Sequence, residues 1–403
     1  MRAAKALGAT ILILMSGCAP VSEPEPEKPA LPDELSLSVT GFASLPGWAS
    51  ADARPAFGAF VASCKRLVAR DESEAFGGVA AYGAVREWRP ACSAAAHGGS
   101  QSEAASRQFF ETWFAPAQAA NRREPVGLYT GYYEPELKGS RKPKGHFQTP
   151  LYARPNDLVS VDLGVFRPTL KGERIAGRVD GVKLVPYATR ADIVGHGLKG
   201  RSKIVTYVDD PVGAFFLQIQ GSGRVRFKDG KVVRVAYDGQ NGHKYTAVGR
   251  ILVDRGEIAR EQLSMQSIRA WLGANPTKAR ELMNENASFV FFKELPIADA
   301  RLGADGAQGV ALTPEASLAV DLRFHGLGAP MWIDANAPSE DGKTAAPFQR
   351  LVVAQDTGGA IRGPVRGDVY WGAGAKAEAI AGHMAHKGKL YVLLPKPVAA
   401  RLN

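Results

Sequence analysis

Short runs of β-prone residues, each ended by Gly, Pro, Asn or Asp, dominate the chain after Arg123 and constrain its fold more than any other feature. The runs are residues 126–133, 203–208, 215–219, 232–237, 288–292, 318–322, 351–354, 368–371 and 390–394. Short strands separated by turn residues are typical of small barrels and sandwiches. No repeat of fixed period occurs, which argues against a solenoid or a propeller. We therefore expect a mainly β protein of two parts.

Helices are expected before these runs and between them. Apolar residues recur at three- and four-residue spacing around residues 54–69, and a second amphipathic pattern covers residues 102–114. Two more helices are expected to begin at Ser264 and at Pro276. We interpret this helical pair as the seam between two domains.

The N-terminus has the pattern of an export signal. Arg2 and Lys5 precede an apolar run, residues 7–15, which is much shorter than the roughly 20 residues needed to span a bilayer. The run ends in Met15-Ser16-Gly17-Cys18, which is similar to a bacterial lipobox, so we expect lipidation at Cys18. Ordinary cleavage beside a spectator cysteine is the alternative. The next residues are rich in Pro and Glu and are suited to a solvated tether.

Two cysteines, Cys64 and Cys92, remain once Cys18 is set aside. In an oxidising compartment two such cysteines pair more often than not. We expect a disulfide that contributes about 3 kcal/mol to stability. Two buried free thiols are the alternative.

The net charge of +10 favours an acidic partner. The basic residues are scattered and form no block with interleaved aromatics, so a nucleic acid is a poor candidate. A cell-wall polymer that carries carboxylates fits the charge equally well.

Residues 355–372 are the stretch best suited to chemistry. An apolar run delivers Asp356 into a glycine-rich turn, and Asp368 begins the next strand. Glycines let the backbone turn sharply or approach a ligand, and two carboxylates at neighbouring strand ends suit acid–base catalysis. The simpler interpretation of each aspartate is a cap on backbone N–H groups.

Two other motifs in the chain are weak. The triplet Asp356-Thr357-Gly358 occurs in aspartic peptidases, but those enzymes need it twice and this chain has it once, so a homodimer would be required. His383 and His386 lack the Glu and the third ligand of a zinc site. We expect no metal and no cofactor.

Four blocks together resemble a known family. Residues 355–372 resemble the "3D" domain that ends the membrane-bound lytic transglycosylase A family, and residues 130–135 (TGYYEP) resemble its T-G-Y-Y-x-P segment. Residues 218–223 (QIQGSG), and residues 241–245 (NGHKY) with the helix start at 264–266, also fit. The blocks follow the family order over roughly residues 125–395.

The resemblance implies a mainly β fold with flanking helices. It implies a double-psi β-barrel, a second, inserted β-barrel-like domain, and a glycan-binding groove between them. The expected organisation is a signal peptide at 1–17, a lipid-anchored tether at 18–45, the N-terminal helical part of the barrel domain at 46–133, the inserted β domain at 134–285 and the double-psi barrel (3D) domain at 286–403.

The resemblance also implies an activity, which is cleavage of peptidoglycan between N-acetylmuramic acid and N-acetylglucosamine to give 1,6-anhydro ends. Asp368 corresponds to the catalytic acid and base, Asp356 to a supporting aspartate and Asp321 to the third family aspartate. The residues expected to bind substrate are Thr130, Gly131, Tyr132, Tyr133, Gln218, Gln220, Gly221, Ser222, Gly358, Gly359 and Ala360. Gln218, Gln220 and Ser222 are expected to alternate along one strand and to face the same way, which suits sugar hydroxyls. A plain hairpin stabilised by polar side chains is the alternative.

The hypothesis is a monomeric lytic transglycosylase in the periplasm, held by a lipid anchor, with the outer membrane favoured by Ala19. Peptidoglycan glycan strands are the expected partner, and the cell-wall synthesis machinery is a further one that no residue supports. The competing hypothesis is a catalytically silent, glycan-binding lipoprotein on the same fold.

Overall fold

The computed structural model describes residues 31–98, 102–170 and 173–402. The expected signal peptide, Cys18 and the first part of the tether, residues 18–30, lie outside the described residues. Every element below belongs to the unit Asp33–Asn403. Within the described residues, no helix is both long enough and apolar enough to cross a membrane.

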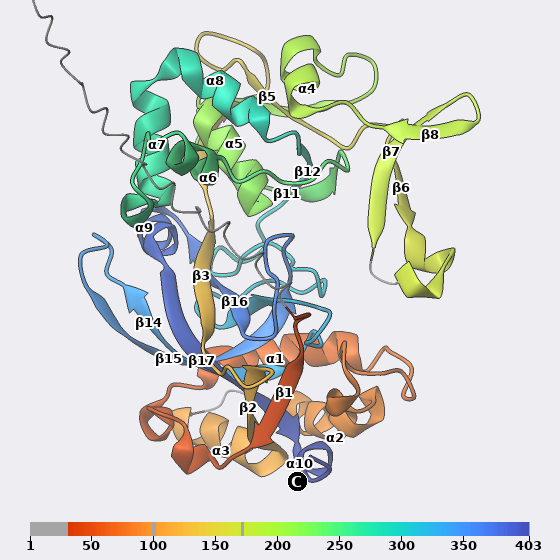
Figure 1. The fold of residues 1–403 in the computed structure, drawn as a ribbon, viewed down its shortest axis with the longest axis vertical. Helices are drawn as coiled ribbons and strands as arrows, with labels where there is room; N and C mark the ends of the chain where they lie inside the picture. The colour runs from red at the N-terminus through yellow and green to blue at the C-terminus, as the bar shows by residue number, and fades with distance from the viewer. Residues whose placement is uncertain (1–30, 99–101, 171–172, 403) are drawn as a thin grey trace, which may run out of the picture. The chain divides into compact units, whose positions relative to one another are not determined.

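An eight-stranded sheet forms the centre of this unit, and six of its strands close into a barrel (Figure 1). The barrel strands are β3 (Gly127–Glu134), β13 (Ser317–Val320), β14 (Pro330–Pro338), β15 (Ala345–Asp356), β16 (Arg366–Ala373) and β17 (Ala385–Pro395). Residues 385–388 of β17 pair with β3, while its residues 390–395 pair with β2 (Phe114–Asn121). Strand β1 (Leu35–Val39) extends the sheet beyond β2 and lies within the range expected for the tether.

Strands β15 and β17 contain continuous apolar runs where both faces are covered. Residues 390–394 of β17 and 351–354 of β15 are buried. Trp332 in β14 is fully buried in the same core. The mainly β class expected from the sequence is confirmed. The runs at 351–354, 368–371 and 390–394 lie within barrel strands, and those at 126–133 and 318–322 overlap β3 and β13.

Helices of the N-terminal region pack beneath the barrel (Figure 1). They are α1 (Arg54–Leu67), α2 (Val85–Ala96) and α3 (Glu103–Trp113), with the short 3-10 helices η1 (Phe42–Ser44), η2 (Trp48–Ser50) and η3 (Ala80–Tyr82). The amphipathic patterns at 54–69 and 102–114 are confirmed as α1 and α3, and the Ser102 hydroxyl caps α3 by accepting from Ala105 N at 3.2 Å. A disulfide joins Cys64 of α1 to Cys92 of α2, with Cα atoms 5.2 Å apart.

A second, six-stranded sheet is formed mainly by residues between β3 and β13. Its spatial order is β12 (Val290–Leu295), β11 (Val232–Gln240), β10 (Ser222–Phe227), β4 (Glu136–Ser140), β9 (Ile204–Val208) and β5 (Thr149–Tyr152). The helices of this region are α4 (Arg190–His196), α5 (Pro211–Gln220), α6 (Val248–Asp254), α7 (Met265–Ala274) and α8 (Pro276–Glu285), with the 3-10 helix η6 (Arg260–Gln262). The expected helices at Ser264 and Pro276 are confirmed as α7 and α8.

The strand expected at 215–219 is wrong, because these residues lie in helix α5. Pro211 occupies the first turn of α5, and Gly221 ends the helix in the left-handed conformation with φ +81°. A short apolar run that is buried on several sides has no clear period of either two or 3.6 residues, so its pattern does not separate helix from strand.

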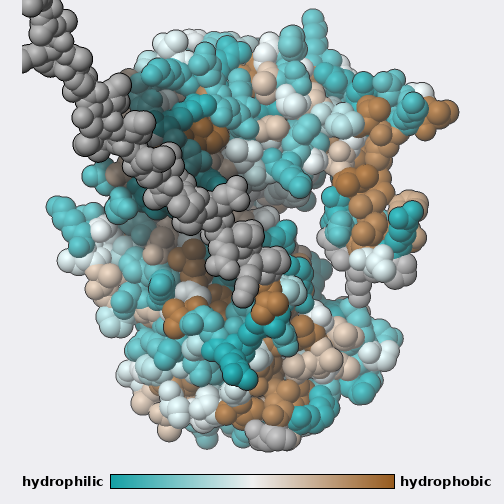
Figure 2. Space-filling model, in the orientation of Figure 1, coloured by the Kyte–Doolittle hydropathy of each residue, from teal (hydrophilic) through white to brown (hydrophobic). Residues whose placement is uncertain are grey.

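A three-stranded sheet projects from the second region as an arm (Figure 1). It consists of β6 (Val159–Asp162), β7 (Arg174–Asp180) and β8 (Lys183–Pro186), with η4 (Leu163–Val165) and η5 (Pro168–Leu170) between β6 and β7. The pairing of Ile175 with Val161 and of Val179 with Leu184 places apolar side chains on one face. That face is exposed, and Figure 2 shows its apolar residues gathered on the arm.

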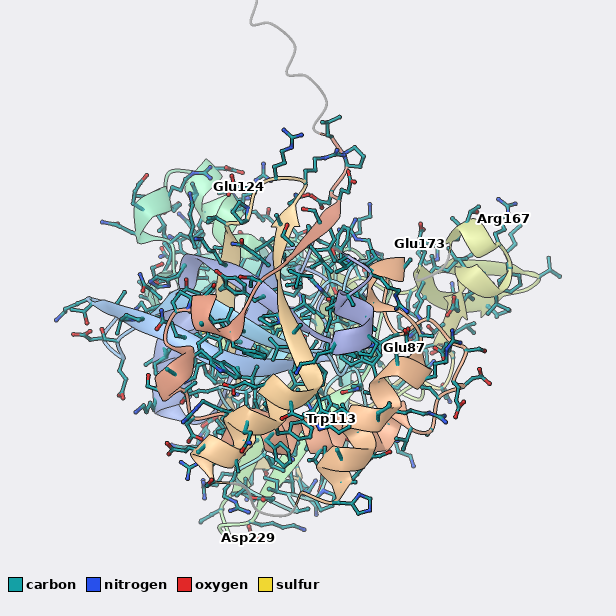
Figure 3. The ribbon with its side chains drawn as sticks, turned by 90° about the horizontal axis from the view of Figure 1, so that it is seen from below. Glu87, Trp113, Glu124, Arg167, Glu173 and Asp229 are labelled. Atoms are coloured by element: carbon teal, nitrogen blue, oxygen red, sulfur yellow. A yellow bond between two sulfur atoms is a disulfide. The ribbon has the colours of Figure 1, made fainter. Side chains whose placement is uncertain are left out.

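The view in Figure 3 confirms that the arm stands apart from the other layers. Arg167 and Glu173, which lie between β6 and β7, are at the right of this view, away from Trp113 of α3. Two short helices complete the described fold: α9 (Ala375–His383), which packs on β3 and β16, and α10 (Lys396–Ala399) at the end of the chain.

Candidate active site

The two expected carboxylates lie in one row that crosses four neighbouring strands of the barrel. Ala319 of β13 is the cross-strand partner of both Asp356 in β15 and Asp368 in β16. Asp368 is in turn the partner of Thr130 in β3. Residues directly opposite each other on paired strands project from the same face of the sheet. The barrel therefore places Asp356, Asp368 and Thr130 on a common face, although Thr130 and Asp368 are 238 positions apart in the sequence.

Asp368 is partly buried beside a short hydrogen-bond chain. The Thr130 hydroxyl donates to Asp368 Oδ1 at 2.5 Å, and Arg366 Nη2 donates to Thr130 Oγ1 at 2.8 Å. Burial raises the pKa of Asp368, and the charge of Asp356 also raises it, whereas the Thr130 hydrogen bond and the Arg366 charge lower it. Because burial is the largest effect, the pKa lies above its ordinary value. Such a carboxyl holds its proton at a higher pH than an exposed aspartic acid does.

Asp356 is held by three donors at the end of β15. The Tyr132 hydroxyl donates to Oδ2 at 2.9 Å, and the backbone N–H groups of Ala307 and Thr357 each donate to Oδ1 at 2.9 Å. Burial raises the pKa of Asp356, and these three hydrogen bonds offset part of the rise. Among the described residues, neither Asp356 nor Asp368 has an ion-pair partner within 4.0 Å.

Asp321, the expected third aspartate, lies just after β13 and does not join this row. Arg323 Nη2 donates to Asp321 Oδ2 at 2.6 Å, and Gly363 N donates to the same oxygen at 2.8 Å. Burial raises the pKa of Asp321, but the hydrogen bonds from Arg323 and Gly363 outweigh it, and the pKa lies below its ordinary value. Asp321 is therefore a charged anchor for its neighbours and is unsuited to donate a proton near neutral pH.

The residues of the TGYYEP block divide between the two faces of β3. Thr130 and Tyr132 face the carboxylates, whereas Tyr133 points to the other side and its hydroxyl contacts Met265 Sδ at 3.8 Å. Successive side chains of a strand alternate between faces, so the two tyrosines cannot share one. Gly131 is required by packing, because a Cβ there would lie 2.6 Å from Trp371 Nε1.

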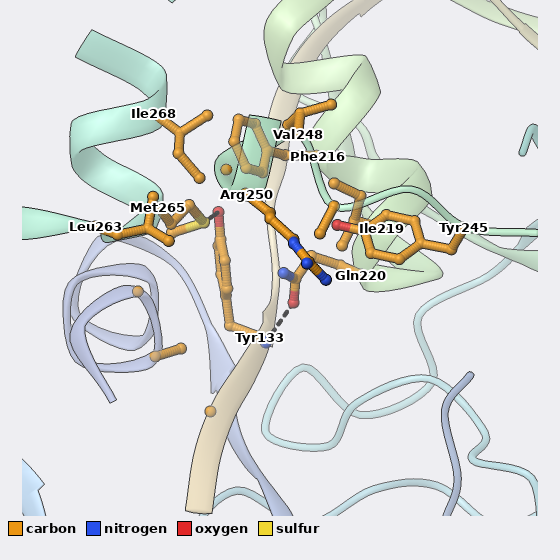
Figure 4. A pocket seen from close by; sticks show the side chains of 15 residues that line it. Tyr133, Phe216, Ile219, Gln220, Tyr245, Val248, Arg250, Leu263, Met265 and Ile268 are labelled. Atoms are coloured by element: carbon orange, nitrogen blue, oxygen red, sulfur yellow. Dashed lines mark hydrogen bonds between the residues drawn. The ribbon is translucent and has the colours of Figure 1, made fainter. Parts of the chain in front are cut away.

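A cavity of about 330 Å³ opens on the Tyr133 side of β3 (Figure 4). Three residues expected to bind substrate line it, namely Gly131, Tyr133 and Gln220. Gln220 Oε1 accepts a hydrogen bond from Tyr133 N at 3.1 Å. The apolar wall is formed by Phe216, Ile219, Val248, Leu263, Met265 and Ile268.

Sequence reasoning missed two polar residues of this cavity, Tyr245 and Arg250, whose side chains Figure 4 shows around the opening. The NGHKY block that ends at Tyr245 was the available signal. Gln218, Gly221 and Ser222 do not line the cavity. The expectation that Gln218, Gln220 and Ser222 alternate on one strand is wrong, because the first two lie in α5 and Ser222 begins β10.

The glycine-rich residues between β15 and β16 lie at the surface beside the carboxylates. Gly359 and Ala360 are exposed and Gly358 is partly buried. A Cβ built on Gly359 would meet no atom within 4 Å, so this position borders open space. The tip of this loop is therefore accessible to a ligand at the surface.

Comparison with known proteins agrees with this arrangement. The family model described as the MltA specific insert domain matches residues 128–293, and the 3D domain matches residues 316–394. Membrane-bound lytic murein transglycosylase A of Escherichia coli strain K12 is 33% identical over 326 residues, which cover 80% of this chain and 77% of the relative. The chain belongs to the membrane-bound lytic murein transglycosylase A family.

Solved structures of the transglycosylase A family share the fold. The membrane-bound lytic murein transglycosylase of Agrobacterium tumefaciens aligns with a TM-score of 0.79 at 33% identity and covers 91% of this chain and 100% of its own. The Escherichia coli MltA structure with bound chitohexaose aligns with a TM-score of 0.61 at 30% identity and covers 84% and 90%.

Proposed function

We propose that this chain is a peptidoglycan lytic transglycosylase that cleaves the bond between N-acetylmuramic acid and N-acetylglucosamine without water, with Asp368 as acid and then base. The observation that carries the proposal is the row of Asp356, Asp368 and Thr130, in which burial and a neighbouring carboxylate raise the pKa of Asp368. The family membership and the chitohexaose-bound relative support a glycan substrate.

In the first step Asp368 donates its proton to the oxygen of the glycosidic bond. The bond between C1 of N-acetylmuramic acid and this oxygen breaks, and the leaving sugar departs with a hydroxyl group. The raised pKa of Asp368 keeps the carboxyl protonated closer to neutral pH, which a general acid requires.

In the second step the C6 hydroxyl of the same sugar attacks C1 and transfers its proton to the Asp368 carboxylate. A 1,6-anhydro ring closes and the acid is regenerated, so atoms and charges balance without water. Because the attacking hydroxyl belongs to the substrate, its high effective concentration replaces the second catalytic carboxylate of a hydrolase. Asp356 serves to raise the pKa of Asp368, and Thr130 orients its carboxyl.

Two surfaces are proposed to contact the glycan. Gly358, Gly359 and Ala360 border the carboxylate row. Tyr133, Gln220 and Tyr245 line the cavity on the other face of β3, where aromatic faces and an amide suit sugar rings and hydroxyls. The cavity's apolar wall and few polar groups are typical of ligand sites.

The proposed setting is the periplasm, with the chain anchored through lipidated Cys18 to the outer membrane. The relative's name, membrane-bound lytic murein transglycosylase A, supports membrane association. The domain boundaries at residues 17, 45, 133 and 285 remain predictions of the same hypothesis.

The decisive experiment is digestion of purified peptidoglycan and mass spectrometry of the released muropeptides. Anhydro-muramic ends are expected. Products with reducing ends would indicate a hydrolase, and binding without release would favour the silent glycan-binding lipoprotein. The Asp368→Asn variant, which keeps shape and hydrogen-bonding capacity, is expected to bind glycan and release nothing.

A further inference from the structure

The loop that joins the two carboxylates is fixed at three points by one short segment. This connecting loop, residues 357–365, runs from β15 to β16. The Thr357 hydroxyl donates to Val320 O at 2.8 Å, and Gly363 N donates to Asp321 Oδ2 at 2.8 Å. The third contact joins Pro364 O to His325 Nε2 at 2.7 Å. All three partners lie within residues 320–325.

The contacts of His325 determine where its proton lies. Pro364 O can only accept, so Nε2 of His325 carries the hydrogen. The ring is buried, and burial lowers the pKa of His325 to about 4, so it is neutral near pH 7. Nδ1 is therefore an acceptor, and the Tyr82 hydroxyl donates to it across 2.5 Å. A directed chain runs from Tyr82 through His325 to the connecting loop.

Tyr82 belongs to the N-terminal helical region and is itself held rigidly. Its ring is fully buried and lies 5.9 Å from Phe76 and 6.3 Å from Trp88, nearly parallel to both. A Cβ at Gly78 would lie 2.2 Å from Arg323 O, so the backbone of this region packs directly on the turn that carries His325. The hydroxyl of Tyr82 therefore has little freedom to move away.

We infer that Tyr82 and His325 are positioning residues, which hold the connecting loop so that Asp368 stays in register with Thr130 and faces the scissile bond. Neither residue borders the carboxylates, and each acts only through Pro364, four positions before Asp368. The catalytic part of this inference rests on the proposed function. A misplacement of about 1 Å at a reacting group can reduce a rate about 100-fold, so a partial loosening has a measurable effect.

The first test compares two tyrosine variants of the full-length protein. Tyr82→Phe removes only the donor to His325. The matched control is Tyr129→Phe, because the buried Tyr129 hydroxyl has no hydrogen-bond partner among the described residues. On peptidoglycan, Tyr82→Phe is expected to lower kcat about tenfold with KM unchanged, and Tyr129→Phe to leave both unchanged. An unchanged kcat for Tyr82→Phe, measured well below its Tm, would overturn the inference.

The second test asks whether hydrogen bonding at His325 can be restored. His325→Leu removes donor and acceptor, whereas His325→Gln retains one of each. The glutamine variant is expected to recover most of the kcat that the leucine variant loses. Equal kcat values in the two variants would show that hydrogen bonding at position 325 does not affect the rate, and would refute the positioning role.

A third measurement separates this inference from the proposed reaction. NMR titration of the Asp368 carboxyl requires no substrate. If the connecting loop loosens in Tyr82→Phe, water reaches Asp368 and its pKa falls toward the ordinary value, while Tyr129→Phe leaves it unchanged. Absence of anhydro products from the wild-type protein would refute the proposed function. An Asp368 pKa that is the same in Tyr82→Phe and in the wild type would refute the positioning role.

Discussion

The carboxylate row and the Asp321 anchor lie at the same end of strand β13, and the pKa of an aspartate is shifted in opposite directions in these two regions. Asp368 pairs with Ala319, two positions before Asp321. Burial dominates at Asp368 and raises its pKa, whereas hydrogen bonds from Arg323 and Gly363 prevail at Asp321 and lower it. The comparison teaches that the balance between burial and hydrogen-bond donors, and not position along a strand, sets the protonation of an aspartate.

The largest expected effect is the loss of activity in Asp368→Asn. Removing the proton donor should reduce anhydro-product release by about 1000-fold or more. The matched variant Asp321→Asn keeps an amide oxygen that can accept from Gly363 N, so it should lose about tenfold at most when assayed well below its Tm. Equal losses of kcat in the two variants would break the distinction between a catalytic and an anchoring aspartate. Muropeptide release followed by mass spectrometry measures both.

The next effect concerns stability at Asp321. Asp321→Asn loses charge-assisted hydrogen bonds and should lower the free energy of unfolding by about 2 kcal/mol near neutral pH. A depressed pKa contributes stability that is present above the ordinary value of 3.8 and is lost as the pH falls through the depressed pKa. The difference from wild type should therefore shrink in acid. Denaturant unfolding at several pH values tests this, and a difference independent of pH would contradict it.

A pH profile sharpens the comparison further. Activity requires protonated Asp368, so turnover should decline as the pH rises through its raised pKa. Asp356→Asn removes a neighbouring negative charge and should move this decline to lower pH. The profile of kcat/KM for both proteins gives the two midpoints. Coincident midpoints would show that Asp356 has no electrostatic influence on Asp368.

The smallest expected effects are a modest loss of rate and a modest gain in stability. Tyr132→Phe removes one donor to Asp356 and should lower kcat about threefold to tenfold.

Asp368→Asn should raise the Tm near neutral pH, because a carboxyl with a raised pKa destabilises the folded state above 3.8. The gain should vanish as the pH falls below 3.8. A lower Tm for Asp368→Asn at neutral pH would contradict the assigned environment.

Much of the barrel could be predicted from the sequence because its strands are β-rich runs bounded by turn residues. The run at 390–394 and the run at 351–354 became β17 and β15 for this reason. Helix α5 was missed because its buried run lacks a distinguishing period. The arm was missed because β6 and β8 have only four residues each, too few to establish a pattern.

The two carboxylates of the candidate site could be predicted from the sequence, but the residues that contact them could not. Asp356 and Asp368 share one glycine-rich stretch, so sequence alone brought them together. The contact of Thr130 with Asp368 depends on a strand pairing across 238 positions, which local patterns do not encode. The separation of Tyr132 from Tyr133 follows from alternation, but which face meets the carboxylates is decided by the barrel. The role of His325 required its two contacts to be seen in space.

Strand β17 closes the barrel, so the active arrangement depends on this late segment of the chain. It is the last strand of the described residues, yet it pairs with β2, β3 and β14 and completes the barrel. A nascent chain released before residue 385 lacks the segment that joins the early and late strands, so Thr130 and Asp368 have no closed barrel to hold them together. We therefore expect a chain that ends before residue 385 to be unable to hold its catalytic groups together and to be inactive.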